Sequence, residues 1–350
     1  MIKLGVIGYG YWGPNLVRNF VDASGCQLVA VSDLDERRLD LVKTRYPGVL
    51  VTTVHQDLFT NPEIDAIAIA TPVASHYKLA MQALSAGKHL FIEKPLTNSA
   101  EQAEQLVAEA DRQNLVLQVD HTFVYTGAVR KIRELVAAQE LGELYYYDSV
   151  RINLGLFQHD VDVIWDLAVH DLSIMDYVFQ ASPIAVSATG MSHVPGKPVN
   201  IAFLTVFFEK DVIAHLHVNW LAPLKIRRTL IGGSRKMIVY DDLEPSEKIK
   251  VYDKGITLNS TSTAESYYHT MINYRLGDMW APQLDITEAL RTETQEFIHC
   301  ITHRQRPISD GQAGLRVVRI LEAARQSLRE NGRPVRLEWL FGRNRRSGAT

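Results

Sequence analysis

The chain has 350 residues, of which 46% are hydrophobic and 22% charged, and 37 Lys and Arg against 40 Asp and Glu give a formal net charge of −3. This composition is typical of a globular protein of about two domains, and it excludes a general basic surface for nucleic acid or for an anionic membrane. The two cysteines, Cys26 and Cys300, are too few for a disulfide scaffold and too far apart for a metal clip. We therefore expect a reducing, cytoplasmic location and no metal site.

The first 120 residues alternate short apolar runs with segments of helical periodicity. Strands are predicted at residues 2–7, 28–32, 66–70, 89–92 and 115–119, and helices at residues 12–23, 35–46, 75–86 and 99–112. This order is typical of a parallel sheet with helices on both faces, so we predict a doubly wound Rossmann domain over residues 1–120. Because the first strand begins at Ile2, we expect no signal peptide, and no apolar run is long enough to span a membrane.

After residue 120 the pattern changes to that of an α+β domain, which we place at residues 121–340. Helices are predicted at residues 127–138, 166–179, 287–303 and 313–330, and strands at residues 144–151, 184–188, 201–208, 212–220, 225–231, 236–240 and 248–252. The runs beyond residue 183 suit an antiparallel sheet, and the polar segment 257–281 suggests a long surface excursion. Residues 341–350 are expected to be a flexible tail, whose arginines form either a frayed end or a small basic patch.

Gly8, Gly10 and Gly13 form a G-x-G-x-x-G motif that follows the first predicted strand and precedes the first predicted helix. In this context the glycines allow a tight turn, close approach of backbone N–H groups to a pyrophosphate, and close packing of the helix on the strand. We therefore expect Gly8, Gly10, Tyr11, Trp12 and Gly13 to bind the phosphates of a dinucleotide cofactor. The alternative is that the glycines only form a turn.

Asp33 ends the second predicted strand, twenty residues after Gly13. An acidic side chain at this place accepts hydrogen bonds from the adenosine ribose and repels a 2′-phosphate, which favours NAD over NADP. Arg37 and Arg38 lie one helical turn further on and offer a partner for such a phosphate, so NADP stays the second choice. The structural alternative makes Asp33 a cap of the helix that opens near Asp35.

Two further motifs carry a resemblance to a known family. Glu93-Lys94-Pro95 follows the predicted strand at 89–92, and Asp166-Leu-Ala-Val-His170 opens the predicted helix at 166–179. Together with the glycine motif they resemble the Gfo/Idh/MocA family of sugar and inositol oxidoreductases, over nearly the whole chain. Residues 10–20, 165–171 and 237–242 are similar to the branch that acts on nucleotide-linked sugars, such as UDP-N-acetylglucosamine and uronate 3-dehydrogenases.

The resemblance implies a Rossmann domain followed by a domain with a large open, mainly antiparallel sheet, which commonly makes dimer or tetramer contacts. We accordingly expect a homodimer or homotetramer assembled through the C-terminal sheet. Two positions depart from the family. Asp120 stands where relatives often have glycine, and Val169 replaces the proline common before the family histidine.

The resemblance also implies the reacting groups. His170 takes the hydroxyl proton as hydride leaves the substrate, a role that suits an imidazole near neutral pH. Asp166 is one helical turn earlier and would orient that ring, unless the two are simply a helix cap and a packed histidine. Lys94 follows a strand at the edge of the sheet where open sheets bind ligands, and its charge favours a developing alkoxide. The alternative is a surface ion pair of Glu93 and Lys94.

The remaining site residues border the cofactor or the substrate. By the resemblance, Thr71, Pro72, His76 and Glu93 lie beside the cofactor, although a histidine at a helix start is often structural. Substrate contacts are expected from Tyr125, Arg151, Asn153 and Lys225, and the alternatives are a core tyrosine and a solvated strand end. Lys225, Arg227 and Arg228 form a basic cluster that suits a diphosphate, but alternation along a strand puts Arg227 and Arg228 on opposite faces.

These features predict an NAD-dependent dehydrogenase or ketoreductase that acts on a secondary ring hydroxyl or ketone, with carbon 3 of a nucleotide-linked sugar as the first choice. One alternative is an inositol or free-sugar dehydrogenase of the same family. An alternative of another class is a regulator that binds NAD and performs no chemistry.

Overall fold

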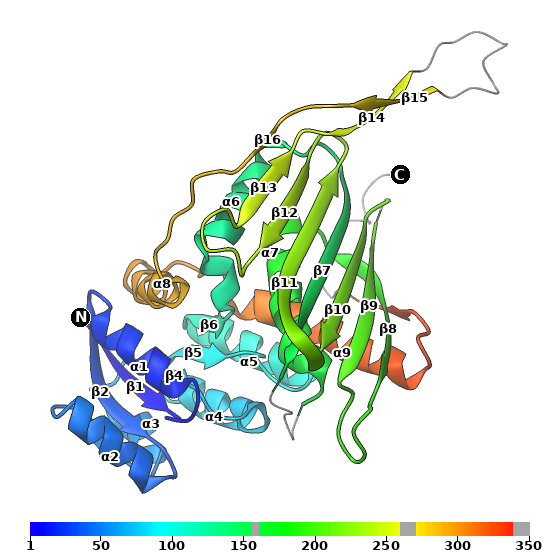
Figure 1. The fold of residues 1–350 in the computed structure, drawn as a ribbon. Coiled ribbons are helices and arrows are strands. Elements are labelled where there is room, and N and C mark those ends of the chain that lie inside the picture. Colours follow the sequence, from blue (N-terminus) through cyan, green and yellow to red (C-terminus); the bar gives the residue numbers. More distant parts are fainter. Residues whose placement is uncertain (156–160, 210, 260–270, 339–350) are drawn as a thin grey trace, which may run out of the picture. The chain divides into compact units, whose positions relative to one another are not determined.

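A computed structural model describes residues 1–155, 161–209, 211–259 and 271–338 (Figure 1). The chain divides into two compact units. The first unit comprises Met1–Arg133, Leu172–Val178 and Leu284–Arg319, and the second comprises Glu134–Asp171, Phe179–Gln283 and Ile320–Thr350. No helix in the described ranges is both long enough and apolar enough to cross a bilayer.

The first unit is built on a six-stranded parallel sheet with the order β3-β2-β1-β4-β5-β6. Its strands are β1 (Ile2–Ile7), β2 (Cys26–Ser32), β3 (Leu50–Thr52), β4 (Ala66–Ile69), β5 (His89–Glu93) and β6 (Leu117–Asp120). The predicted doubly wound fold is therefore confirmed. Periodicity does not predict β3, because three residues are too few to show an alternation.

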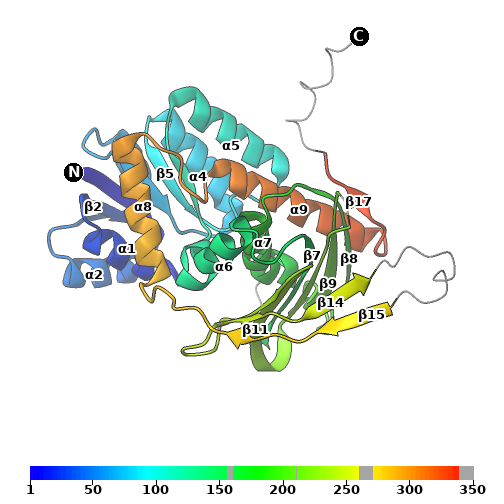
Figure 2. The ribbon, with the colours of Figure 1, turned by 90° about the horizontal axis from the view of Figure 1, so that it is seen from above.

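Helices cover this sheet on both faces, and Figure 2 shows α8 on one side of β5 and α5 on the other. The N-terminal helices are α1 (Gly13–Asp22), α2 (Glu36–Arg45), α3 (Gln56–Thr60), α4 (Val73–Ser85) and α5 (Ala100–Gln113), followed by the 3₁₀ turn η1 (Thr122–Tyr125) and α6 (Gly127–Ala137). The late helix α8 (Ala289–His303) also belongs to this unit. Phe20 of α1, Phe91 of β5 and Phe297 of α8 meet edge to face, with ring centroids 5.3 to 6.1 Å apart, so α8 completes the core.

The second unit is built on a nine-stranded sheet with the order β16-β13-β12-β11-β7-β10-β9-β8-β17. Its strands are β7 (Leu144–Leu154), β8 (Pro183–Met191), β9 (Ile201–Phe208), β10 (Ile213–Asn219), β11 (Leu221–Gly233), β12 (Met237–Asp241), β13 (Ile249–Tyr252), β16 (Met279–Trp280) and β17 (Val335–Arg336). All neighbours are antiparallel except β10 and β7, which confirms the predicted mainly antiparallel sheet.

Two local features of this part of the chain go beyond the expectations. The segment 257–281 is not merely an excursion, because β14 (Gly255–Asn259) and β15 (Met271–Arg275) form a hairpin that projects beyond the sheet (Figure 1). The helix predicted from Asp166 begins earlier, with a π turn η2 (Ile164–Ala168) that continues into α7 (Val169–Phe179). The last long helix is α9 (Gly311–Arg329), and the predicted tail at 341–350 lies outside the described residues.

Candidate active site

The glycine motif forms the turn between β1 and α1, and its geometry requires two of the three glycines. Gly8 has a φ of +98°, and a Cβ there would lie 2.6 Å from the carbonyl oxygen of Ala70. A Cβ on Gly13 would lie 2.3 Å from the carbonyl oxygen of Gly8. At Gly10 the nearest atom is the Arg38 guanidinium at 3.5 Å, so the approach to this backbone is open. The turn therefore fits the pyrophosphate of a dinucleotide at the N-terminus of α1.

Asp33 is bound to this turn from the end of β2. Its Oδ2 accepts a hydrogen bond from the backbone N–H of Tyr9 at 2.6 Å, and its Oδ1 accepts one from the N–H of Asp35 at 2.8 Å. The cap of α2 is Asp35, whose side chain accepts a hydrogen bond from the N–H of Arg37, so the proposed capping role of Asp33 is wrong. Asp33 instead lies between the turn and the second strand, where a ribose hydroxyl would meet it.

The two arginines beside Asp33 differ in their placement. Arg37 pairs with Asp35 at 2.9 Å, and its side chain is 90% exposed. Arg38 turns towards Asp33, with its Nη1 3.4 Å from both carboxylate oxygens. The predicted ribose position therefore has the Asp33 carboxylate beside it, with the Arg38 guanidinium close to that carboxylate. The roles of Arg37 and Asp33 in cofactor binding stay predictions.

The loops after β4 and β5 are joined by a buried histidine. His76 Nε2 lies 2.7 Å from the carbonyl oxygen of Thr71, and its Nδ1 lies 3.0 Å from that of Pro95. Burial lowers the pKa of His76, so the neutral ring is favoured. This placement favours the structural alternative for His76, which fixes the loop carrying Thr71 and Pro72 next to the loop carrying Lys94.

Lys94 follows β5 directly, and the Lys94–Pro95 peptide bond is cis. Glu93 and Lys94 are both half-buried, which does not fit the alternative of a solvated surface pair. The lysine therefore lies at the carboxyl edge of the parallel sheet, two strands away from the glycine turn in the order β1-β4-β5. This edge is where open α/β sheets bind their ligands.

Sequence reasoning missed a cluster of buried polar groups at the end of β6. Asp120 accepts hydrogen bonds from Trp12 Nε1 at 2.5 Å and from the Thr122 hydroxyl. His121 is 1% exposed, and neither ring nitrogen has a hydrogen-bond partner among the described residues. Burial above all, with the charges of Lys94 and Arg316, lowers the pKa of His121 to about 3, so the ring is neutral.

Tyr125, predicted at the substrate pocket, is buried in the core of the first unit. Its hydroxyl donates to Glu296 Oε2 at 2.5 Å and lies 2.9 Å from the hydroxyl of Ser309. Burial, with the charges of Glu293 and Glu296, raises the pKa of Tyr125 well above its usual value. These contacts favour the alternative of a core tyrosine.

In the second unit, Asp166 lies in the π turn and His170 in the first turn of α7. Asp166 Oδ2 accepts a hydrogen bond from the indole Nε1 of Trp220 at 3.0 Å, and Trp220 is fully buried at the end of β10. Trp220 is not among the predicted site residues, and the structure gives it a hydrogen bond to a predicted catalytic carboxylate. A buried donor of this kind fixes the orientation of Asp166.

Arg151, a predicted substrate residue, forms a buried ion pair with Asp171. The guanidinium Nε and Nη2 donate to the two carboxylate oxygens at 2.8 and 3.0 Å. Because Asp171 directly follows His170, this pair links β7 to the first turn of α7. The guanidinium is engaged by a carboxylate of the protein itself, which favours a structural role for Arg151 over a contact with substrate.

The remaining substrate predictions fall on β7 and β11. Asn153 is half-buried on β7 and Lys225 is exposed on β11. Arg227 pairs with Asp242 at 3.2 Å and Arg228 with Asp241 at 2.9 Å, so much of the charge of the basic cluster is balanced by neighbouring carboxylates. Lys94 belongs to the first unit and His170 to the second, and their joint action is part of the proposal below.

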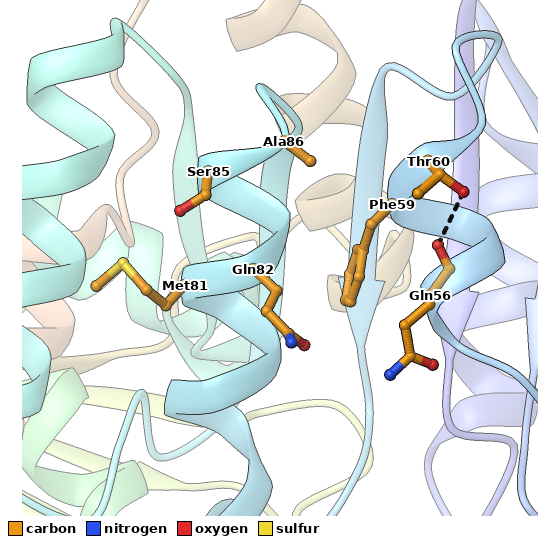
Figure 3. A pocket seen from close by; sticks show the side chains of 7 residues that line it. All are labelled: Gln56, Phe59, Thr60, Met81, Gln82, Ser85 and Ala86. Carbon is orange, nitrogen blue, oxygen red and sulfur yellow. Dashed lines mark hydrogen bonds between the residues drawn. The ribbon is translucent and has the colours of Figure 1, made fainter.

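A shallow groove between α3 and α4 lies apart from these residues (Figure 3). Its lining is uncharged and consists of Gln56, Phe59, Thr60, Met81, Gln82, Ser85 and Ala86. None of these side chains offers an acid, a base or a cation for hydride-transfer chemistry. The carboxyl edge of the sheet therefore stays the candidate site of the first unit.

Two family models match the chain over most of its length. Residues 2–121 match the family model described as "Oxidoreductase family, NAD-binding Rossmann fold", and residues 133–337 match the one described as "Oxidoreductase family, C-terminal alpha/beta domain". The chain is 30% identical to the uncharacterized oxidoreductase YdgJ of Escherichia coli (strain K12) over 260 residues, which are 71% of this chain and 73% of that protein.

Two relatives have a named substrate. UDP-N-acetylglucosamine 3-dehydrogenase of Acidithiobacillus ferrooxidans is 27% identical over 321 residues, 91% of this chain and 94% of that protein. Its solved structure has a TM-score of 0.80 at 25% identity, and the match covers 94% of this chain and 98% of that one. The scyllo-inositol 2-dehydrogenase (NAD(+)) of Bacillus subtilis (strain 168) is 23% identical over 352 residues, 96% of both chains.

Proposed function

Because this chain belongs to the Gfo/Idh/MocA family of NAD-binding oxidoreductases, we propose that it is a dehydrogenase that oxidises carbon 3 of a nucleotide-linked sugar, or runs the reverse reduction. The observation that carries the proposal is the arrangement of one edge of the parallel sheet. The glycine turn follows β1 and Lys94 follows β5, so a cofactor site and a cation stand at the same carboxyl edge of one sheet. The similarity to UDP-N-acetylglucosamine 3-dehydrogenase supports the choice of substrate.

In the proposed mechanism, bound NAD supplies the hydride acceptor or donor. His170 takes the proton of the reacting hydroxyl, and an imidazole suits this task because its ordinary pKa is near neutrality. Asp166, held by the Trp220 indole, orients His170 and stabilises the imidazolium that forms. The ammonium group of Lys94 donates a hydrogen bond to the same substrate oxygen and favours its negative charge.

We propose NAD rather than NADP as the physiological cofactor. Asp33 places a carboxylate where a 2′-phosphate would lie, and it is held there by the Tyr9 N–H. Arg38 reduces this repulsion, since its guanidinium lies 3.4 Å from the carboxylate. Calorimetric titration of the purified chain with NADH and NADPH tests the preference. The proposal requires tighter binding of NADH, and equal or tighter binding of NADPH contradicts it.

The first alternative is an inositol or free-sugar dehydrogenase, which the similarity to scyllo-inositol 2-dehydrogenase supports. Such a substrate has no diphosphate and would make no use of Lys225, an exposed residue of the basic cluster. Product analysis with UDP-linked sugars against free inositols separates the two. A regulator without chemistry is the second alternative, and it predicts NADH binding with no turnover of either substrate class.

We further propose that the chain forms a homodimer or homotetramer through the nine-stranded sheet. On β9 and β10 buried residues alternate with exposed ones, so one face is covered and the other is open. The open face carries Phe203, which is 42% exposed and stacks on His215 and His217 of β10. Exposed aromatic side chains on a flat sheet are typical of subunit contacts.

A further inference from the structure

The hydrogen bond between Trp12 and Asp120 joins two distant strands of the parallel sheet. Trp12 lies in the turn after β1 and Asp120 ends β6, while β4 and β5 stand between those strands. Neighbouring strands are about 4.8 Å apart, so β1 and β6 are separated by roughly 14 Å, and the turn after β1 spans this separation together with the two side chains. They must therefore cross the carboxyl ends of β4 and β5, which is the edge where open sheets bind ligands.

Asp120 is arranged as an acceptor. It is 2% exposed, its Oδ2 accepts from Trp12 Nε1 and its Oδ1 accepts from the Thr122 hydroxyl. Two donors, one on each oxygen, suit an ionised carboxylate. Asp120 also pairs in register with Glu93, the residue before Lys94. Burial raises the pKa of Asp120, and the hydrogen bonds from Thr122 and Trp12 and the charge of Lys94 oppose this rise by favouring the ionised form.

Glu293 on α8 lies behind Asp120 and has the opposite character. It is fully buried, and in the described part of the chain neither of its carboxyl oxygens receives a hydrogen bond from an N–H or a hydroxyl group. Its carboxyl group lies within hydrogen-bonding reach of that of Asp120. Two carboxyl groups bond to each other only when one of them carries a proton. Since Asp120 already has two donors and Glu293 has none, the proton belongs on Glu293.

The electrostatics agree with this assignment. Burial, followed by the charge of Asp120 and then those of Glu296 and Glu93, raises the pKa of Glu293 well above its usual value. Several neighbouring elements contribute groups that act on Asp120 and Glu293. The groups are Trp12 before α1, Glu93 and Lys94 at the end of β5, Thr122 in η1 and Glu296 on α8. Apart from Lys94, the charged ones are acids, so they favour the neutral form of Glu293.

We propose that Asp120 and Glu293 are a carboxyl pair sharing one proton and that they position the cofactor site: Glu293 donates to Asp120, and Asp120 holds the Trp12 indole as a platform for the nicotinamide half of the dinucleotide. The inference rests on the proposed location of the cofactor at this edge. It does not depend on which sugar is the substrate. Asp120 and Glu293 act through Trp12 and are positioning residues.

The test is a calorimetric titration of the full chain with NADH and with ADP-ribose, which lacks the nicotinamide. Asp120→Leu and Trp12→Phe each remove the hydrogen bond to the indole, because leucine has no acceptor and phenylalanine has no donor, so each should weaken NADH binding by about tenfold. The double variant should lose no more than either single variant, because both remove the same bond. ADP-ribose should bind all variants within about threefold of the wild type.

Glu293→Gln is the matched control. Its amide is neutral and still donates to Asp120, so its NADH affinity should stay within about twofold of the wild type. Three results would each overturn the proposal: additive losses in the double variant, an equal loss of ADP-ribose affinity, or a loss in Glu293→Gln as large as in Asp120→Leu. Thermal unfolding shows whether each variant is folded, and if Asp120→Leu is not, Trp12→Phe and Glu293→Gln decide alone. A wild type that binds NADH but turns over no nucleotide sugar contradicts only the proposed substrate.

Discussion

Lys94 is the residue whose replacement separates chemistry from cofactor binding. Lys94→Met keeps the length of the side chain and removes the charge that favours a developing alkoxide. We expect turnover to fall by about 10²-fold or more while NADH affinity changes little. Steady-state kinetics and calorimetry on the same preparation check this. Near-normal turnover in Lys94→Met would remove the lysine from the mechanism.

The buried His121 is expected to make the stability of the chain depend on pH. Its pKa is lowered from 6.5 to about 3 in the folded chain, so the ring stays neutral there while the unfolded chain binds a proton below pH 6.5. The unfolded state then binds more protons, and stability falls as the pH falls from 6.5 towards 3. The expected slope from this group is about 1.4 kcal/mol per pH unit.

His121→Gln removes this titration and keeps a polar side chain of similar size. Urea unfolding at a series of pH values below 6.5 should therefore show a shallower loss of stability in the variant than in the wild type. The contribution of Glu293 has the opposite sign, since its raised pKa favours the folded state in acid, but it is common to both proteins and cancels in the comparison. Identical slopes would mean that His121 is protonated in the folded chain.

At the scale of elements, the Arg151–Asp171 pair connects β7 with α7 just after His170. Both side chains are buried, so Arg151→Met leaves a carboxylate without its partner and should lower the free energy of unfolding by about 3 kcal/mol or more. Replacing both residues, as in Arg151→Met with Asp171→Leu, should recover part of this loss. Arg228→Met removes an exposed pair with Asp241 and should cost less than about 1 kcal/mol. If urea unfolding gives the same loss of stability for Arg151→Met and Arg228→Met, the result contradicts a buried Arg151–Asp171 ion pair.

Most strands and long helices of the first unit are predictable from the sequence. Apolar runs and helical periodicity predict the buried strands and long helices of the first unit, because burial on both faces leaves a clear pattern. The glycine motif is predictable for the same kind of reason, since Gly8 and Gly13 have no room for a side chain. The π turn at Ile164–Ala168 is not predictable, because its residues have no distinctive spacing.

Part of the candidate site depends on contacts between distant segments, which periodicity does not report. Asp120 and Trp12 are 108 residues apart, and no local pattern joins them. Glu293 has a weak signal that could have been used. It shares one face of α8 with the buried Leu290 and Phe297, and a carboxyl group among such positions must find a partner or a proton. From the sequence, Arg151 is only an arginine near the end of a strand. Its partner Asp171 is identified by the structure.

The proposed homodimer or homotetramer can be tested by the mass of the protein in solution. Sedimentation velocity should show a dimer or tetramer, because an open sheet face with an exposed Phe203 is expected to be covered by a second copy. Phe203→Glu should shift the distribution towards the monomer, since it places a charge in that contact. Leu41→Glu changes an exposed apolar residue on α2, outside the nine-stranded sheet, and is the control. A monomeric wild type would contradict the proposed assembly.

The proposed function is hydride transfer between NAD and a nucleotide-linked sugar. It is tested by NADH absorbance during incubation of the purified chain with NAD and a panel of UDP-linked sugars, with free inositols in parallel. We expect NADH formation with a UDP-linked sugar at a kcat/KM at least about tenfold above that of any inositol, and its near loss in Lys94→Met. NADH formation with a free inositol and none with any UDP-linked sugar would contradict it.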